Sequence, residues 1–397
     1  MILIKDCSLS AVIAGFVTIL VGFTSAAVIV FQAAQALGAS PTEVGSWLWA
    51  LGLGMGSTSI GLSLCYRVPI VTAWSTPGAA MLITSSAGVS MSEAVGAFLI
   101  CAGLMTMFGF TGWFERIMRH LPLSLASGML AGILLQFGLD VFTVMQTRFV
   151  MVFIMFCVYI VLRRSVPRYA VVAALIAGIL IAGSQGLVQL ETVQLRWAQP
   201  ILTLPQFSVS ALMGIALPLF LVTMASQNVP GVATIRAFGY AVPTSPLIGW
   251  TGAATLLLAP FGAFAINLSA ITAAISMGRE AHEDPHKRYV AAVTVGVLYM
   301  VIGLFGATVG SVFAALPQEL VLAIAGLALL GTLGNGLAIA LTQEKDREPA
   351  LITFLVTASG VTLFGIGSAF WGLIAGVLTI AISQASHRLI SAVGPSD

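Results

Sequence analysis

Charge is scarce in this chain. Only 8% of its 397 residues are Asp, Glu, Lys or Arg, whereas an average soluble domain carries about 25%. Hydrophobic residues make up 59% of the chain, and its mean hydropathy is +1.06. Such a composition excludes a soluble fold. We therefore predict an all-α polytopic membrane protein, whose chain crosses the lipid bilayer many times.

Motifs for several classes of function are also missing. The four cysteines form no C-x-x-C pair, and the chain has no zinc pattern and no Gly-rich phosphate loop. It has no basic and aromatic surface of the kind that binds nucleic acid. No cluster of His, Asp and Glu and no nucleophile–base pair falls within the apolar blocks. We expect no metal, no cofactor, no nucleic-acid partner and no enzymatic activity, and an ATP-driven pump is excluded on this chain.

Long apolar blocks fill most of the sequence, separated by short joints that are charged or rich in Gly and Pro. A membrane-spanning helix needs about 20 apolar residues. Cutting the chain at the joints gives fourteen predicted spans: 9–37, 42–65, 69–88, 92–112, 122–142, 149–162, 169–185, 207–228, 244–259, 261–277, 289–314, 318–341, 350–366 and 368–390.

The basic residues support this division and orient it. With the N-terminus inside and the spans alternating, fourteen Lys and Arg residues lie on the inside. Only two, Arg148 and Arg196, lie on the outside. Cytoplasmic loops are enriched in Lys and Arg, so we predict that both termini are cytoplasmic.

Four short stretches recur in order along the chain. "SLSAV" returns as "SVSAL", "ALG" as "AFG", "LPLSL…LL" as "LPQEL…LL" and "LIAGIL" as "LIAGVL", at offsets of 200, 201, 195 and 198 residues. The chain therefore reads as two halves of seven spans. Because seven is odd, the second half enters the membrane from the opposite side, which is the inverted repeat typical of secondary transporters.

One predicted span is interrupted by polar and helix-breaking residues. Residues 68–83 read "VPIVTAWSTPGAAMLI", which begins like a strand and continues like a helix. Ser75 or Thr76 can cap this helix, and Pro77 suits its first turn. We predict that span 3 is half strand and half helix.

A matching interruption lies about 195 residues later. Residues 261–275 read "FGAFAINLSAITAAI", and Asn267 or Ser269 can cap the helix that follows. We predict that span 10 is also half strand and half helix, and that the two strands pair, because lipid cannot satisfy extended backbone. The simpler alternative is that Pro77 only kinks a helix and that Asn267 is a satisfied core residue.

Two half-helices that begin near the midplane bring two helix N-termini together there. Their partial positive charges and free N–H groups favour an anion, and neutral amides and hydroxyls can hold a carboxylate. The alternative for the polar residues is hydrogen bonding between helices. Trp74 and Phe264 can stack on a flat ligand. The predicted substrate-binding residues are Ser25, Trp74, Ser75, Thr76, Pro77, Gly78, Ser226, Gln227, Asn228, Asn267, Leu268 and Ser269.

Three segments carry a resemblance to a known family. "VPIVTAWSTPGAAMLI", "LPLFLVTMASQNVPGVATIRAFGY" and "LVTASGVTLFGIGSAFWGLIAG" resemble the BenE family of benzoate:proton symporters, over nearly the whole chain. That family is a distant relative of the nucleobase transporters with the seven-plus-seven inverted-repeat fold. The resemblance implies a core domain (1–112, spans 1–4, and 206–315, spans 8–11) and a gate domain (113–205, spans 5–7, and 316–397, spans 12–14).

The resemblance further implies proton-coupled import of benzoate, or a related small aromatic carboxylate, across the bacterial inner membrane by an elevator-type movement. The nucleobase branch carries carboxylates on spans 8 and 10 that hydrogen-bond the base. The matching positions here, about 226–227 and 266–267, are neutral. A carboxylate there would repel benzoate, so its absence agrees with an anionic substrate. A homodimer is left open.

Proton coupling needs a titratable group, and few lie within the spans. Asp140, in "LLQFGLDVF" toward the outer end of span 5, is the deepest acidic residue and the one candidate for carrying the proton. Benzoate crossing with its own proton is the alternative. The competing functions are a uniporter or channel-like carrier of small inorganic anions, and a nucleobase transporter of the same fold.

Overall fold

The computed structural model describes residues 6–86, 88–113, 123–189, 191, 193, 195–269, 271–279, 281–363 and 368–392. Most of these residues are helical. Within these ranges, six helices are long and apolar enough to cross a membrane, or seven if the bent helix α2 (Leu9–Ala36) is counted as one span. The chain is therefore a mostly helical polytopic membrane protein, as its composition predicts.

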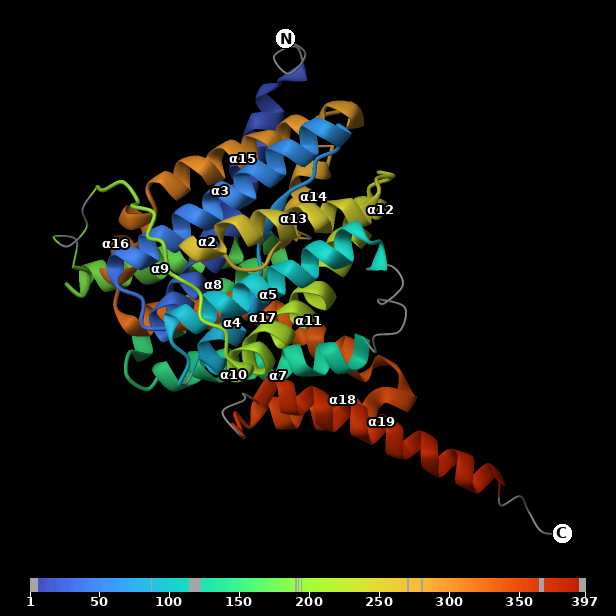
Figure 1. Cartoon of the computed structure of the whole chain (residues 1–397). Coiled ribbons are helices and arrows are strands. Elements are labelled where there is room, and N and C mark those ends of the chain that lie inside the picture. The colour runs from blue at the N-terminus through green and yellow to red at the C-terminus, as the bar shows by residue number, and fades with distance from the viewer. Residues whose placement is uncertain are drawn as a thin grey trace.

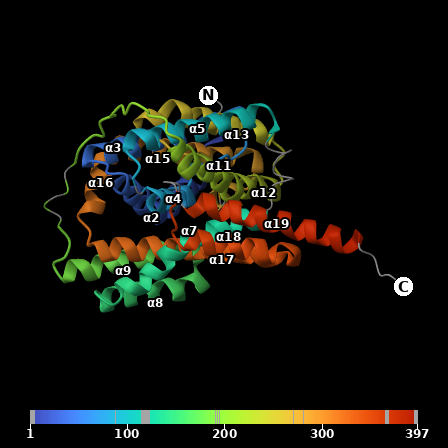
Figure 2. The same ribbon diagram turned by 60° about the horizontal axis from the view of Figure 1, so that its bottom comes forward.

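The helices, which are labelled in Figure 1, form two groups that are separated in Figure 2. In the first group α3 packs on α15 and α5 packs on α13. The group contains α2 and α3 (Pro41–Tyr66), α4 (Thr76–Ser85), α5 (Met91–Phe110), α10 (Val209–Ala211), α11 (Leu217–Thr223), α12 (Val229–Ala237), α13 (Thr244–Leu258), α14 (Ile271–Met277), α15 (Tyr289–Leu304) and α16 (Gly306–Ala314). Two π-helical turns, Leu212–Ala216 and Met224–Asn228, join α10, α11 and α12.

In the second group α7 packs against both α17 and α18, and α8 packs against α9. Figure 2 shows these helices together below the first group. Short 3₁₀ turns precede α9 and α18. The helices are α7 (Leu123–Val144), α8 (Phe149–Ser165), α9 (Ala170–Ser184), α17 (Gln318–Thr342), α18 (Arg347–Ala358) and α19 (Ser368–Ala392). The joint at 114–122 lies outside the described residues.

Two three-residue strands lie inside the first group. β1 (Thr72–Trp74) pairs with β2 (Ile266–Leu268) in antiparallel orientation, with Ala73 opposite Asn267. Each strand is followed directly by a short helix, α4 after β1 and α14 after β2. The predicted half-strand, half-helix form of both segments, and the pairing of the strands, are thus confirmed.

Helix α3 supplies side chains that satisfy the backbone leading into β1. Ser63 Oγ accepts a hydrogen bond from the Ile70 N–H (3.1 Å) and donates one to the Ile70 carbonyl (3.0 Å). Ser59 Oγ accepts from the Thr72 N–H at 3.0 Å. Lipid cannot provide such partners. The strand therefore depends on α3.

Other elements of the first group satisfy the backbone of β2. Thr255 Oγ1 of α13 accepts from the Ile266 N–H at 3.1 Å. Asn228 Oδ1 accepts from the Leu268 N–H at 3.0 Å, and the Val71 carbonyl accepts from the Ser269 N–H at 2.9 Å. These bonds keep extended backbone in the interior without a wider sheet.

Candidate substrate site

A cavity of about 560 Å³ lies where the two groups of helices meet beside the strand–helix junctions. The first group contributes residues from α2, β1, α4, the π-helical turn and α14, and the second contributes residues from α7, α9 and α17. Six of the predicted binding residues line it: Trp74, Thr76, Pro77, Ser226, Gln227 and Ser269.

At the first junction, Ser75 caps α4 from behind the cavity wall. Its side chain is fully buried, and Ser75 Oγ accepts from the Gly78 N–H (3.1 Å) and from Thr223 Oγ1 (2.9 Å). Gly78 packs against Leu219. Neither Ser75 nor Gly78 lines the cavity. Ser75 fixes the position at which α4 begins, and Thr76 and Pro77 are the residues that face the ligand space.

Replacing Ser75 with Ala should lower the stability of the protein, although Ser75 does not itself contact the substrate. The variant loses a helix cap and leaves the Thr223 hydroxyl without its acceptor, which costs about 1–2 kcal/mol. We expect a lower thermal midpoint and a weaker substrate affinity together. Ser165→Ala, an exposed hydroxyl at the end of α8, is the control. Equal midpoints for the two variants would contradict the capping role.

The π-helical turn Met224–Asn228 separates three consecutive polar residues. Ser226 and Gln227 line the cavity, and Ser226 Oγ also donates to the Val222 carbonyl at 2.6 Å. Asn228 is fully buried and points away from the cavity, and its Oδ1 accepts a hydrogen bond from the Leu268 N–H. π-Helical turns are frequent at functional sites. Here the turn joins the cavity lining to the support of β2.

At the second junction, Ser269 and Thr272 face the cavity and hydrogen-bond each other at 2.5 Å. Asn267 lies within β2, where its Nδ2 donates to the Ala265 carbonyl at 2.9 Å. Among the described residues, no group donates to its buried Oδ1. Leu268 is buried as well. Asn267 therefore supports the junction and does not begin the helix.

Of the two aromatic residues that the sequence suggests for stacking, only Trp74 lines the cavity. The Trp74 ring lies 5.3 Å from that of Phe23. Phe264 is fully buried against Trp47 and Phe98. The prediction that Phe264 stacks on a ligand together with Trp74 is therefore wrong for this cavity. The Ser25 side chain lies outside the described part of the chain.

The second group of helices supplies cavity residues that sequence reasoning missed. Ser127 of α7 and Thr332 and Asn335 of α17 face the first group across the cavity, and Tyr299 joins them from α15. A polar residue at mid-helix, such as Asn335 in "GTLGNGLAIA", was the available signal. Only the packing of the two groups brings these residues to one place.

Neutral groups make up the cavity lining. Among the described residues that line it, none is acidic, basic or histidine. Hydroxyls and amides from both groups supply donors for a carboxylate, and apolar side chains such as Leu130, Val171 and Leu329 provide surface for a hydrocarbon ring. The arrangement suits a small ligand with one polar end and one apolar end.

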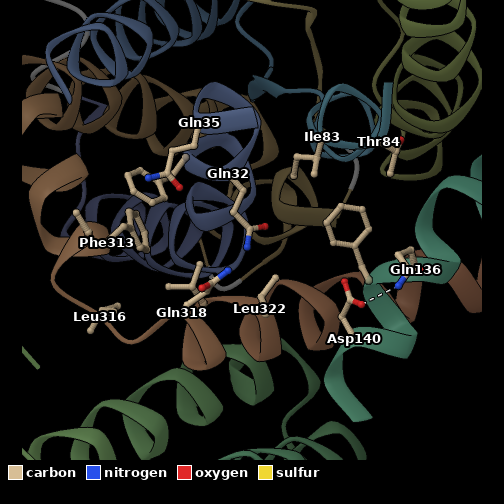
Figure 3. A pocket seen from close by; sticks show the side chains of 14 residues that line it. Gln32, Gln35, Ile83, Thr84, Gln136, Asp140, Phe313, Leu316, Gln318 and Leu322 are labelled. Carbon is tan, nitrogen blue, oxygen red and sulfur yellow. Dashed lines mark hydrogen bonds between the residues drawn. The ribbon is translucent and has the colours of Figure 1, made fainter. Parts of the chain in front are cut away.

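Asp140 lies in a different pocket, near the ends of α2 and α4. Asp140 Oδ1 accepts from Gln136 Nε2 at 2.8 Å, and the amides of Gln32, Gln35 and Gln318 line the same space (Figure 3). Asp140 is half-buried, and it does not line the central cavity. Any role in transport therefore has to be exerted from the interface between the two groups and not by contact with a ligand in the cavity.

Comparison with known proteins identifies close relatives in sequence. The BenE family profile, described as "Benzoate membrane transport protein", matches residues 5–382. Inner membrane protein YdcO of Escherichia coli K12 is 48% identical, covering 92% of this chain and 93% of the relative. A benzoate membrane transport protein of Acinetobacter baylyi is 40% identical, covering 95% and 96%.

Solved structures of similar fold are much more distant in sequence. The transmembrane domain of the cyanobacterial bicarbonate transporter BicA has a TM-score of 0.60 at 14% identity, covering 93% of this chain and 97% of that one. The murine anion transporter Slc26a9 in its inward-facing state has a TM-score of 0.55 at 13% identity, covering 97% and 69%. These two likenesses concern the fold alone.

Proposed function

Because the chain belongs to the BenE family of benzoate membrane transport proteins, we propose that this membrane transporter imports benzoate, or a related small aromatic carboxylate, together with protons across the bacterial inner membrane. The observation that carries the proposal is the uncharged cavity beside the two strand–helix junctions. Its hydroxyl and amide groups bind the carboxylate, and its apolar wall accepts the ring. No lining carboxylate among the described residues repels the anion.

We propose that Thr76, Gln227 and Ser269 bind the carboxylate directly and that Trp74 and Pro77 border the ring. Ser226 lies beside them, and its hydroxyl proton is donated to the Val222 carbonyl. The remaining predicted residues act through these. The hydrogen bond from the Gly78 N–H to Ser75 fixes the start of α4, and the one from the Leu268 N–H to Asn228 fixes β2. Asn267 stabilises the second junction through its bond to the Ala265 carbonyl. Tyr299, Thr332 and Asn335 complete the cavity.

The proposed arrangement is a seven-plus-seven inverted repeat of fourteen spans, and the helix starts support it. Ser8 Oγ accepts from the Ala11 N–H at 3.2 Å, and Ser208 Oγ accepts from the Ala211 N–H at 3.1 Å. Both caps have φ of −125°. Spans 1 and 8 thus begin with the same local geometry, 200 residues apart.

The ends of these two helices repeat as well. Leu37 N–H bonds to the carbonyl four residues earlier, and Phe238 does the same 201 residues later. Each is followed by a glycine with positive φ, 80° at Gly38 and 82° at Gly239. Together with the antiparallel pairing of β1 with β2, these pairs support two halves related by a two-fold axis.

On this proposal the first group of helices is a core (1–112 and 206–315) that carries the substrate site, and the second is a gate (113–205 and 316–397) against which it moves like an elevator. The central cavity reaches Pro167 and Ile339, which lie beside the basic joints at 163–164 and 345–347. With both termini cytoplasmic, these joints are cytoplasmic, and the cavity faces inward.

The experiment that tests the function is uptake of labelled benzoate into liposomes containing the purified protein, with and without an imposed pH gradient. We expect accumulation above the external concentration only with the gradient, and no accumulation of uracil or chloride. Equilibration that a gradient cannot drive uphill would instead favour a uniporter or channel. Accumulation of uracil would favour the nucleobase alternative.

Asp140→Asn tests the candidate for proton coupling. If Asp140 carries the proton, the variant should lose gradient-driven accumulation by at least about tenfold and retain exchange of labelled for unlabelled benzoate, because exchange needs no net proton movement. Gln136→Ala, which removes the hydrogen bond to Asp140 but not its charge, is the control. Full accumulation by Asp140→Asn would assign the proton to another group or to benzoate itself.

A further inference from the structure

A second cavity, of about 790 Å³, lies at the opposite end of the molecule from the basic joints, around the C-terminal ends of α2 and α16. The segment 195–199 forms one wall of this cavity, which we call the outer vestibule. Backbone bonds fix the wall. Arg196 N–H donates to Thr308 Oγ1 (3.0 Å), which donates back to the Arg196 carbonyl (3.1 Å), and Ala198 N–H donates to the Leu304 carbonyl (2.8 Å).

Arg196 gives the outer vestibule a positive charge. Of the two basic residues assigned to this side, Arg148 is paired with Glu319 at 3.6 Å. The Arg196 guanidinium forms no ion pair within the described ranges, and its side chain is exposed. Glu43 does not line the vestibule, although Thr42 and Val44 do, and its carboxylate accepts hydrogen bonds from the Ser40 N–H and hydroxyl, both at 2.7 Å. The Arg196 guanidinium can therefore form an ion pair with an incoming carboxylate.

The residue next to Arg196 offers an aromatic surface. The Trp197 indole stacks on Phe305, with ring centroids 4.6 Å apart and planes 27° apart. One face of the indole is thus fixed by Phe305, and the side chain is still 65% exposed. Phe31 and Val44 add apolar surface, and Gln35 adds an amide. A cation beside an exposed aromatic face matches both ends of an aromatic carboxylate.

We propose that the outer vestibule is a capture site, at which Arg196 binds the carboxylate of an aromatic acid and Trp197 stacks on its ring before the ligand moves to the central cavity. This inference rests on the proposed function. Phe31 and Gln35 line both the vestibule and the Asp140 pocket, and α2 continues from there to Ala26 and Gly22 of the central cavity. One helix, α2, thus contributes residues to all three spaces.

The test is transport kinetics of labelled benzoate in vesicles of known sidedness. Arg196→Gln should raise the KM for external benzoate by about tenfold, because electrostatic attraction raises the rate of encounter by at least about that factor. The maximal rate, and the KM for efflux of benzoate loaded inside, should stay unchanged. Arg148→Gln, at the paired arginine, should leave both constants unchanged, and Arg196→Lys should restore most of the external affinity.

Ionic strength provides a second measurement that needs no variant. Salt screens an exposed charge over about 10 Å at 0.1 M, so the external KM of the unaltered protein should rise with added salt, and that of Arg196→Gln should not. Trp197→Phe should retain more affinity than Trp197→Ala. An external KM that is independent of salt, or equal changes in influx and efflux, would overturn the capture site. Absence of benzoate transport by the unaltered protein would overturn the proposed function instead.

Discussion

Replacing Gln227 with Glu should weaken benzoate binding by about 100-fold at neutral pH. The two side chains have nearly the same shape, so the cavity keeps its volume and gains one negative charge. Two like charges about 6 Å apart at an effective dielectric constant of about 20 repel by about 3 kcal/mol. Gln227 lines the cavity among neutral residues, and no described cation there would offset the new charge.

The measurement is the Kd of benzoate for the purified variant, because uptake would mix binding with the driving force. Gln185→Glu is the matched control, since Gln185 is exposed just beyond the end of α9 and does not line the cavity. We expect the control to keep the original Kd. A Kd for Gln227→Glu within about threefold of the original would remove Gln227 from the carboxylate site.

Lowering the pH tests in a second way whether charge repulsion causes the loss of affinity. A carboxyl group has an ordinary pKa of about 4.3, and it loses its charge when it gains a proton. As the pH falls, protonation removes the charge of the introduced carboxyl group, and affinity should recover over the range in which benzoate keeps its own charge. Affinity of the Gln185→Glu control should not change over the same range. Failure to recover would indicate damage to the fold and not charge repulsion.

The strand–helix junctions could be predicted from sequence because their signals are local. Ser75 next to Thr76 and Pro77 is a helix start that a few residues determine, and the structure has the cap at Ser75. The strand before it is short and apolar, and extended backbone inside a membrane protein needs a partner. The pairing of β1 with β2 follows from that requirement.

The side chains behind the junctions could not be assigned in this way. Ser226, Gln227 and Asn228 are consecutive, and an ordinary helix would spread them around one turn. The π-helical turn Met224–Asn228 sends Asn228 to Leu268 and leaves its two neighbours at the cavity. Because consecutive helical residues point in different directions, the three side chains cannot all face one space. Which of them turns away depends on the π-helical turn, and that turn leaves no clear mark in the sequence.

Long-range packing decided the rest of the candidate site. Phe264 is apolar and near β2, but the chain turns at Ala265, which has a φ of 39°, and Phe264 points to Trp47. Thr332 and Asn335 reach the cavity because α17 lies across it. Neither outcome depends on neighbours in sequence. A single sequence can therefore locate the junctions and cannot supply the facing wall.

Replacing Gly52 with Val should prevent stable folding. α3 and α15 approach so closely that a Cβ at Gly52 would lie 2.6 Å from the Tyr299 carbonyl oxygen and 2.7 Å from Gly303 Cα. A Cβ at Gly56, one turn later, would lie 2.7 Å from the Gly296 carbonyl oxygen. Small residues four apart allow such contacts between membrane helices. Backbone atoms cannot move aside like a side chain, so we expect a cost above about 3 kcal/mol.

Gly61→Val is the matched control for this prediction. Gly61 lies on the same helix, and outside that helix no atom of the described residues lies within 4 Å of a Cβ built there. Gly61→Val therefore shares the change in helix propensity without the clash. We expect monodisperse protein with a near-normal thermal midpoint from Gly61→Val and little or none from Gly52→Val. Equal yields and midpoints would show that the helices can separate. Because α3 also holds the backbone of β1 through Ser59 and Ser63, any Gly52→Val protein that survives should bind benzoate poorly.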